Sequence, residues 1–202
     1  MNTTPPTSPP PPTETTIPSD TPVPEPIYLS GEGDAIVELD KPAGPMLVQI
    51  TGNAAGEAFK IVHRNETNRP IGILVDTDQP YEGVRLIDYF PYHHTTQFVV
   101  TATGAWEIAV LPLTEARRLQ VPGTISGSTD DVFVLAGATP NLAVIERRFP
   151  QGRFSAITYG DSRRLLVDTQ QVYTDSVILD RSAWIVEIIA AGEWVIEISA
   201  VE

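Results

Sequence analysis

The 202-residue sequence contains no cysteine. Disulfide bonds, thiol nucleophiles and thiolate metal sites are therefore excluded. The sequence also lacks an apolar run of about 18 residues, the length that a membrane-spanning helix needs, so we expect no direct insertion into a membrane. Its N-terminus has neither the basic start nor the apolar middle of a signal peptide. Because the leader described below is typical of exported proteins, we expect that an export segment preceded Met1.

Basic residues are scarce. Thirteen Lys and Arg face 26 Asp and Glu, which gives a formal net charge of −13. A polyanion repels phosphate backbones and anionic lipid surfaces, so a nucleic-acid partner is not expected. The acidity is typical of a protein kept soluble by its charge. Calcium or a cationic partner is the alternative explanation.

Proline is concentrated at the N-terminus, where residues 1–26 hold ten of the nineteen prolines together with many threonines. Proline fixes φ and removes a hydrogen-bond donor, and the leader has too little apolar area to form a core. We therefore predict a disordered, solvated leader with polyproline II character. It would act as a stalk that holds the rest of the chain away from a surface and that can carry glycans. A plain disordered tail is the alternative.

After the leader, short apolar or alternating runs are separated by Gly, Pro, Asn and Asp, and valine, isoleucine and threonine are abundant. These features favour β-strands. Fourteen strands are predicted near residues 34–39, 46–51, 57–63, 71–76, 83–88, 96–102, 105–111, 131–135, 141–147, 153–159, 164–168, 175–179, 184–190 and 193–199, with short edge strands at 27–29 and 124–126. The predicted fold is all-β: two tandem antiparallel β-sandwich, jelly-roll-like domains behind the disordered leader.

Three sequence blocks occur twice in the same order, which indicates a tandem duplication. The block SGEGDAIV at 30–37 matches SGSTDDVF at 126–133, ILVDTDQPY at 73–81 matches LLVDTQQVY at 165–173, and GAWEI at 104–108 matches GEWVI at 192–196. The predicted boundaries are residues 27–112 for the first domain, 113–122 for a linker with about one helical turn, and 123–202 for the second domain.

The duplicated residues mostly have structural interpretations. Asp76 and Asp168 are expected to end a strand and to bond nearby amides as Asx turns. Tyr81 and Tyr173 are expected to open the next strand and to pack across the sandwich. Trp106 and Trp194 follow a glycine on the last strand, where a large ring can close the end of the core.

This pattern resembles the small β-sandwich repeats of bacterial exported and surface proteins, which begin with a Ser-Gly-x-x-Asp block and end in Gly-x-Trp-x-Ile. It is also distantly similar to bacterial pre-peptidase C-terminal domains, although only Asp76 and Asp168 stand near that family's Asp-rich strand. The resemblance extends over residues 27–200. It implies a non-catalytic accessory role in binding, adhesion or spacing.

Catalytic motifs are missing from the sequence. There is no G-x-S-x-G nucleophile elbow and no phosphate-binding glycine-rich loop. The three histidines, His63, His93 and His94, belong to the first domain alone, so a metal site built on them would not be a property of both domains. We predict no enzyme activity, no catalytic residues and no bound organic cofactor.

Two kinds of ligand remain as hypotheses. Glu32 and Asp34 in the first domain, and Asp130 and Asp131 in the second, occupy equivalent loops and are candidate calcium ligands, because Ca²⁺ takes six to eight oxygen ligands. Trp184 is the tryptophan that the two domains do not share, since it aligns with Thr96. It is the candidate for glycan binding, with a core or domain-interface position as the alternative.

The functional prediction is a non-catalytic, extracytoplasmic interaction or adhesion module that meets a protein or glycan at a cell surface. One alternative is a structural subunit of an extracellular filament or surface layer, which self-assembles through its leader or its edge strands. Another is a carbohydrate-binding module.

Overall fold

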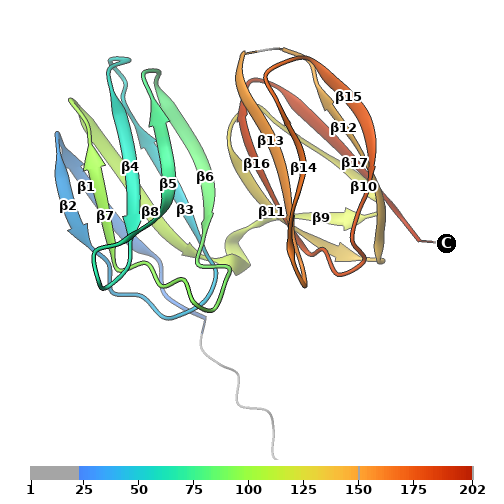
Figure 1. Ribbon diagram of the computed structural model, residues 1–202, viewed down its shortest axis with the longest axis horizontal. Helices are drawn as coiled ribbons and strands as arrows, with labels where there is room; N and C mark the ends of the chain where they lie inside the picture. The colour runs from blue at the N-terminus through green and yellow to red at the C-terminus, as the bar shows by residue number, and fades with distance from the viewer. Residues whose placement is uncertain (1–22, 150, 202) are drawn as a thin grey trace, which may run out of the picture.

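The computed structural model describes residues 23–149 and 151–201, and both parts of the chain after the leader form β-sandwiches (Figure 1). The predicted all-β sandwich fold is confirmed. The leader prediction for residues 1–22 lies outside the described residues, and 23–26 precede the first strand without joining a sheet. Within the described residues, no helix is long and apolar enough to cross a membrane.

The first sandwich consists of two four-stranded sheets. Sheet A has the order β1-β8-β3-β6 and sheet B the order β2-β7-β4-β5, which is the arrangement of a jelly roll. The strands are β1 (Ile27–Glu32), β2 (Ala35–Glu38), β3 (Met46–Gly52), β4 (Phe59–Arg64), β5 (Pro70–Thr77), β6 (Tyr81–Ile87), β7 (Gln97–Thr101) and β8 (Ala105–Pro112).

The second sandwich has the same order, strand for strand. Sheet D is β10-β17-β12-β15, and sheet C is β14-β13-β16-β11 with β9 added at its edge. The elements are η1 (Leu113–Glu115), β9 (Arg117–Val121), β10 (Gly123–Gly127), β11 (Asp131–Gly137), β12 (Pro140–Arg147), β13 (Gln151–Tyr159), β14 (Arg163–Thr169), β15 (Tyr173–Ile178), β16 (Ile185–Ala191) and β17 (Trp194–Ala200).

The strand register matches residues of one sandwich with residues of the other. In both, the pairing of the fourth and fifth strands shifts at the same place, between Ile61 and Val62 in β4 and between Ala156 and Ile157 in β13. Residues at the same position in this register are called equivalent below. The equivalence lets a contact made by one sandwich be compared directly with the other.

The two tryptophans of the last strands have the position that the sequence predicts. Trp106 is 3% exposed and Trp194 is fully buried, and each indole Nε1 donates to a backbone oxygen 3.0 Å away, of Gly33 and Thr129 respectively. Each ring lies flat against the glycine opposite it. A Cβ added to Gly127 would clash with the ring of Trp194, so a side chain at this position would push the ring from its place.

Each sandwich has its own core, because side chains alternate between the two faces of a strand. In the first sandwich Val48, Ile50, Phe98 and Ile108 are among the residues buried between sheets A and B. In the second, Phe133, Ile145, Phe154 and Ile196 are buried between sheets C and D. The cores of the two sandwiches are separate, which agrees with two domains.

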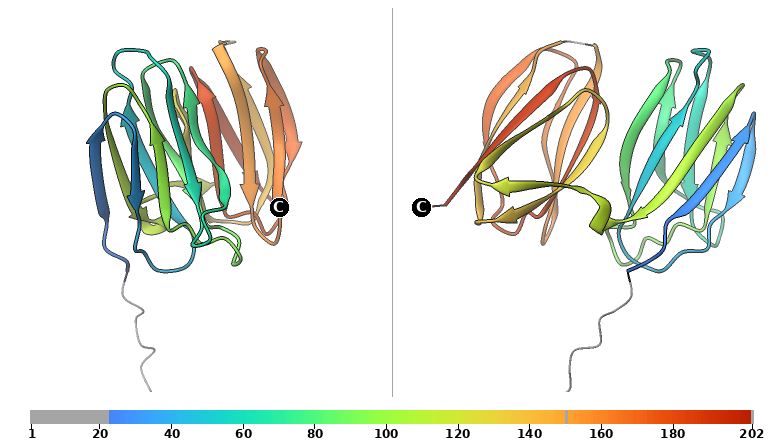
Figure 2. Two further views of the ribbon diagram at one scale, coloured as in Figure 1. Left: turned by 60° about the vertical axis from the view of Figure 1, so that its left-hand side comes forward. Right: turned by 180° about the vertical axis from the view of Figure 1, so that it is seen from behind.

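The segment expected to be a linker is only partly a linker. Leu113–Glu115 form the short helix η1, but Arg117–Val121 form strand β9, which pairs in parallel with β11. Figure 2 shows β9 from behind, between the linker and the second sandwich. The physical reason is burial: Leu119 and Val121 alternate into the core of the second sandwich and are 5% and 2% exposed.

The Asx turns expected at Asp76 and Asp168 are replaced by turns built on the following threonine. Thr77 Oγ1 accepts the amide N–H of Gln79 at 3.0 Å, and Thr169 Oγ1 accepts that of Gln171 at 3.0 Å. The two aspartates point along the sheet surface instead, where Asp76 pairs with Lys60 at 2.8 Å. Tyr81 and Tyr173 open β6 and β15, as predicted.

Candidate functional site

The most highly organised region outside the two cores is the contact between the sandwiches. A third apolar cluster joins Leu47 and Leu86 of the first sandwich to Val132, Ile157 and Ile185 of the second. Leu47 alternates with core residue Val48, and Val132 with core residue Phe133, so both point away from their own cores. The outward face of sheet C therefore packs against the first sandwich near its edge strand β6.

A buried ionic network crosses this contact. Arg85 of β6 donates from Nε to Glu187 Oε1 at 3.0 Å, and from Nη1 to the backbone oxygen of Leu74 at 2.5 Å. Glu187 also accepts the hydroxyl of Tyr159 at 2.6 Å and the amide N–H of Leu86 at 3.3 Å. Each charged group thus has partners from more than one strand.

Asp130 is the second acid of the network. Its Oδ2 accepts the hydroxyl of Tyr81 at 2.7 Å and lies 3.6 Å from Arg85 Nη1, while its Oδ1 accepts the amide N–H of Ala190 at 2.7 Å. The backbone oxygen of Asp130 accepts the amide N–H of Val84 at 3.0 Å. The exposed edge of β6 is thereby covered by the second sandwich, which protects it from pairing with another chain.

The protonation of these groups is set by burial and by their neighbours. Burial alone lowers the pKa of Arg85, but Glu187 and Asp130 raise it above the ordinary arginine value, so the guanidinium stays charged. Burial raises the pKa of Asp130, and Arg85 and Tyr81 oppose that change. Burial, and then the adjacent carboxylate, raises the pKa of Tyr81 and of Tyr159. Both phenols therefore remain hydrogen-bond donors.

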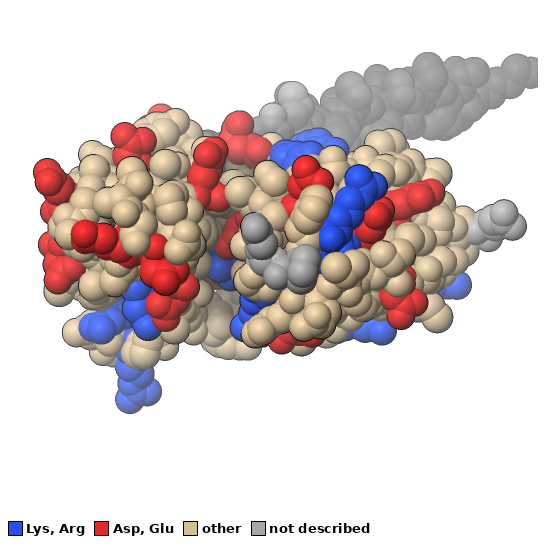
Figure 3. Space-filling model, turned by 90° about the horizontal axis from the view of Figure 1, so that it is seen from above, with Lys and Arg blue, Asp and Glu red and all other residues tan. Residues whose placement is uncertain are grey.

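Above this contact the sandwiches enclose a cleft with a volume of about 760 Å³. Its walls include Asp76, Tyr81 and Arg85 from the first sandwich and Asp130 and Arg153 from the second. Figure 3 looks down on this end of the molecule and shows acidic side chains scattered over both sandwiches, with basic ones between them. The charges do not gather into a single-sign patch on this face. The cleft has mixed polarity, and three of these five residues belong to the network described above.

A second buried polar chain lies beside the contact, within the first sandwich. Lys41 Nζ pairs with Asp88 Oδ2 at 2.7 Å, and both side chains are fully buried. Asp88 Oδ1 accepts the hydroxyl of Thr95 at 2.7 Å, and Thr95 Oγ1 lies 2.9 Å from His63 Nδ1. Burial lowers the pKa of His63 to about 4, which Asp88 partly opposes. His63 is therefore neutral near pH 7, and its ring is held in the buried chain by Thr95.

The four calcium candidates lie in two separate loops, one in each sandwich. Asp130 is occupied as described, and Asp131 is bound by Arg117 Nη1 at 2.6 Å and accepts the amide N–H of Val132. Glu32 and Asp34 are exposed in the first sandwich, and Asp34 Oδ1 accepts the amide N–H of Ala102 at 3.0 Å. Among the described residues no group of three or more His, Cys, Asp or Glu side chains is placed to hold a metal ion.

Trp184 lies at the margin of the domain contact and is 42% exposed. Its ring centroid is 6.5 Å from that of Tyr89, which in turn lies 4.7 Å from that of Tyr159. The backbone of Trp184 bonds on both sides, to Tyr159 and to Leu135. The position combines a domain-interface contact with a half-exposed ring.

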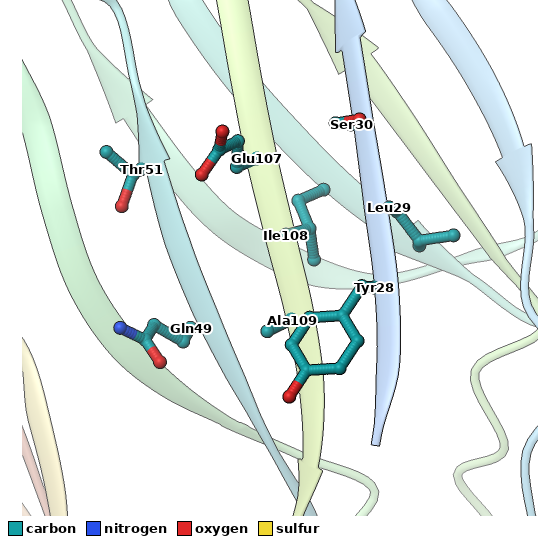
Figure 4. Close-up of a pocket in the computed structure, with 8 residues that line it drawn as sticks. All are labelled: Tyr28, Leu29, Ser30, Gln49, Thr51, Glu107, Ile108 and Ala109. Carbon is teal, nitrogen blue, oxygen red and sulfur yellow. The ribbon is translucent and has the colours of Figure 1, made fainter.

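A shallow groove of about 380 Å³ lies on the outward face of sheet A (Figure 4). The ring of Tyr28 lies over Ala109, its register partner, and is 75% exposed. Glu107 stands between Ser30 and Thr51, its partners on the two neighbouring strands. Glu107 is the one carboxylate among the residues that line this groove.

The interface charges are the residues that the sequence analysis missed. Arg85 and Glu187 lie about a hundred positions apart, so their pairing has no local signal. One indication was available: Arg85 is equivalent to Val177 and Glu187 to Val99. A charge at a strand position that carries valine in the other sandwich points to a contact that only one sandwich makes.

Comparison with known proteins adds no assignment, since no protein-family model and no curated protein matches the chain. The fold and the interface define a protein made of two jelly rolls joined by a buried ionic contact.

Proposed function

We propose that the chain is a non-catalytic interaction module that acts outside the cytoplasm, in which two duplicated jelly rolls form one rigid body and make contacts through their sheet faces. The observation that supports this most directly is the use of the buried charges. Arg85 of the first sandwich binds Glu187 of the second. Glu187 and Asp130 also accept backbone amides, those of Leu86 and Ala190 respectively. Groups bound in this way hold the two domains in a fixed relation and present no acid–base pair to a substrate.

The composition supports the same role. A Pro- and Thr-rich leader can hold such a body away from a surface, and the high acidity keeps it soluble there. The absence of cysteine is compatible with an oxidising compartment because each sandwich has a large apolar core of its own.

The proposal is tested on intact cells that make the protein. A protease added outside the cells should cut in the Pro/Thr-rich leader and release a folded fragment that begins near Val23, because the sandwiches after it are compact. Cell lysis should not be needed for this release. A protein that is cut only after lysis, in the soluble cytoplasmic fraction, would contradict the proposal.

Carbohydrate binding is a second candidate function, and the groove at Tyr28 supports it. An exposed aromatic ring in a groove that Glu107, Gln49 and Thr51 also line (Figure 4) offers an apolar platform with hydrogen-bonding groups, the combination that small-molecule sites need. Affinity electrophoresis in gels that contain soluble polysaccharides tests it. Tyr28→Ala should abolish retardation if the groove binds the polysaccharide, and Trp184→Ala should do so if Trp184 binds it. Retardation of neither wild type nor variants would exclude both sites.

A further inference from the structure

The contact between the sandwiches is made by a row of side chains that runs across sheet C. Val132 pairs laterally with Glu187, Glu187 with Ile157, and Ile157 with Leu165. The first three are 1%, 3% and 3% exposed because the first sandwich covers them, and Leu165 is at the margin, 46% exposed.

The equivalent row crosses sheet B of the first sandwich, and it is apolar from end to end. Ile36 pairs laterally with Val99, Val99 with Val62, and Val62 with Ile73. No described residue of the second sandwich joins these four in the apolar contact cluster. Ile36 is 65% exposed and Ile73 is 51% exposed. A lateral row of branched apolar side chains on an outer face is a surface that binding would cover.

The edge on which sheet C docks also has an equivalent. In the contact, Leu86 of β6 is paired with Leu47 of β3, and both are buried against the second sandwich. On the second sandwich the equivalent pair is Ile178 of β15 with Leu142 of β12. Ile178 is 67% exposed. The chain therefore has two equivalent edges: the β5–β6 edge, which is docked, and the β14–β15 edge, which is free.

The docked surfaces, the β5–β6 edge and the outer face of sheet C, are joined by an ion pair, whereas the free surfaces have apolar residues at the same two positions. Arg85 of the docked edge and Glu187 of the docked face bind each other at 3.0 Å. Their equivalents on the free edge and the free face are Val177 and Val99. Val99 takes the place of Glu187 on the free face, and Val177, which packs against the core of its own sandwich, takes the place of Arg85. Docking of the free edge on the free face would therefore bury no unpaired charge at these two positions.

The free surfaces also carry the tyrosine and the aspartate that form a hydrogen bond in the contact. Asp34 is equivalent to Asp130, and it accepts the amide N–H of Ala102 as Asp130 accepts that of Ala190. Tyr173 is equivalent to Tyr81, the tyrosine that donates to Asp130. A free edge that docked on a free face would bring Tyr173 to Asp34.

From these matches we propose that a second copy of this chain docks its β14–β15 edge on the outer face of sheet B, in the way that sheet C meets the β5–β6 edge within one chain. This interface joins two different surfaces, so it is heterologous and continues from copy to copy into an open, head-to-tail assembly. The inference deepens the proposed function by naming the partner of the interaction module.

The contact between copies is smaller than the contact within the chain. Inside the chain a second row, Val134, Ile185 and Tyr159, packs in the same cluster as Leu113 and Ala116, which follow β8. The equivalents on sheet B are Glu38, Gln97 and Arg64, which are polar. The assembly is therefore reversible and depends on protein concentration.

The test is sedimentation velocity of the chain at concentrations up to about 1 mM. The wild type should form a ladder of oligomers that lengthens with concentration. Ile36→Glu blocks the face and Ile178→Glu blocks the edge, and each variant alone should remain a monomer. An equimolar mixture should form a dimer and stop there. The intact edge of one variant docks on the intact face of the other, and only the two blocked surfaces are left. Tyr173→Phe should weaken association about tenfold through loss of its hydrogen bond to a carboxylate.

Tyr28→Glu is the matched control, since Tyr28 is an exposed apolar residue on sheet A outside both surfaces, and this variant should assemble like the wild type. Circular dichroism of each variant should be unchanged, because Ile36, Ile178 and Tyr28 are exposed and Tyr173→Phe keeps the half-buried ring. A wild type that stays monomeric, or single variants that still assemble, would overturn the inference. A chain that is monomeric yet released from intact cells by protease would overturn self-assembly and leave the proposed function standing.

Discussion

Replacing Glu187 by valine should uncouple the two sandwiches and destabilise the chain. Glu187 accepts hydrogen bonds from Arg85, Tyr159 and the backbone of Leu86. Without it the Arg85 guanidinium, whose side chain is 13% exposed, loses its nearest carboxylate while remaining largely buried. Removing one partner of a buried ion pair costs about 3–5 kcal/mol, because the other charge is left uncompensated.

The double variant Arg85→Val with Glu187→Val separates the charge effect from the packing effect. It removes both charges and reproduces the residues found at the equivalent free positions, Val177 and Val99. Replacing a buried pair by apolar residues of suitable size is often neutral. We therefore expect the double variant to recover most of the stability that the single variant loses.

Urea unfolding followed by tryptophan fluorescence measures these effects, because one tryptophan is buried in each core and Trp184 lies at the contact between them. Glu197→Val, at an exposed position of β17, is the control for the loss of a surface carboxylate. The reasoning is refuted if Glu187→Val is no more destabilising than Glu197→Val, or if the double variant is less stable than the single one.

Three further predictions concern the interiors of the sandwiches. The pKa of His63 is about 4 when folded and about 6.5 when unfolded. The neutral imidazole therefore contributes fully to the free energy of unfolding above pH 6.5, and up to about 3 kcal/mol of it is lost as the pH falls toward 4. His63→Gln should flatten this part of a pH–stability curve. Asp88→Ala should cost about 3–5 kcal/mol in urea unfolding, because it leaves the buried ammonium of Lys41 unpaired, whereas loss of under 1 kcal/mol would contradict the buried pair. Gly127→Ala should lower stability by about 1–3 kcal/mol by pushing Trp194 from its place, and an unchanged melting temperature would show that the ring has room to move.

The strands were predictable because each sandwich supplies its own pattern. Apolar residues alternate along β4 and β17, and turn residues separate the strands, so the alternation and the turn residues indicate the same strand boundaries. The duplicated Gly-x-Trp segments marked the last strands, and the structure places both tryptophans in the cores. Local chemistry and burial lead to the same assignment at these positions.

Strand β9 and the interface were not predictable in the same way. Arg117–Val121 has only Leu119 and Val121 as apolar residues, and its pairing with β11 is set by the second sandwich beneath it. The interface depends on how two folded bodies meet, so the partners of Arg85 follow from tertiary contact alone. Asp130 is a candidate calcium ligand in sequence because a loop carboxylate gives the same signal whether it binds an ion or, as here, a tyrosine.

The measurement that tests the rigid pairing of the sandwiches most directly is amide hydrogen exchange on edge strand β6. The amides of Val84 and Leu86 donate to Asp130 and Glu187 across the contact, and the amide of Ile178, equivalent to Leu86, is the internal control. At concentrations where the chain is monomeric, the account predicts that Val84 and Leu86 exchange as slowly as amides inside the sheets, while Ile178 exchanges fast. Fast exchange at all three amides would show that the two sandwiches move independently and would contradict the account.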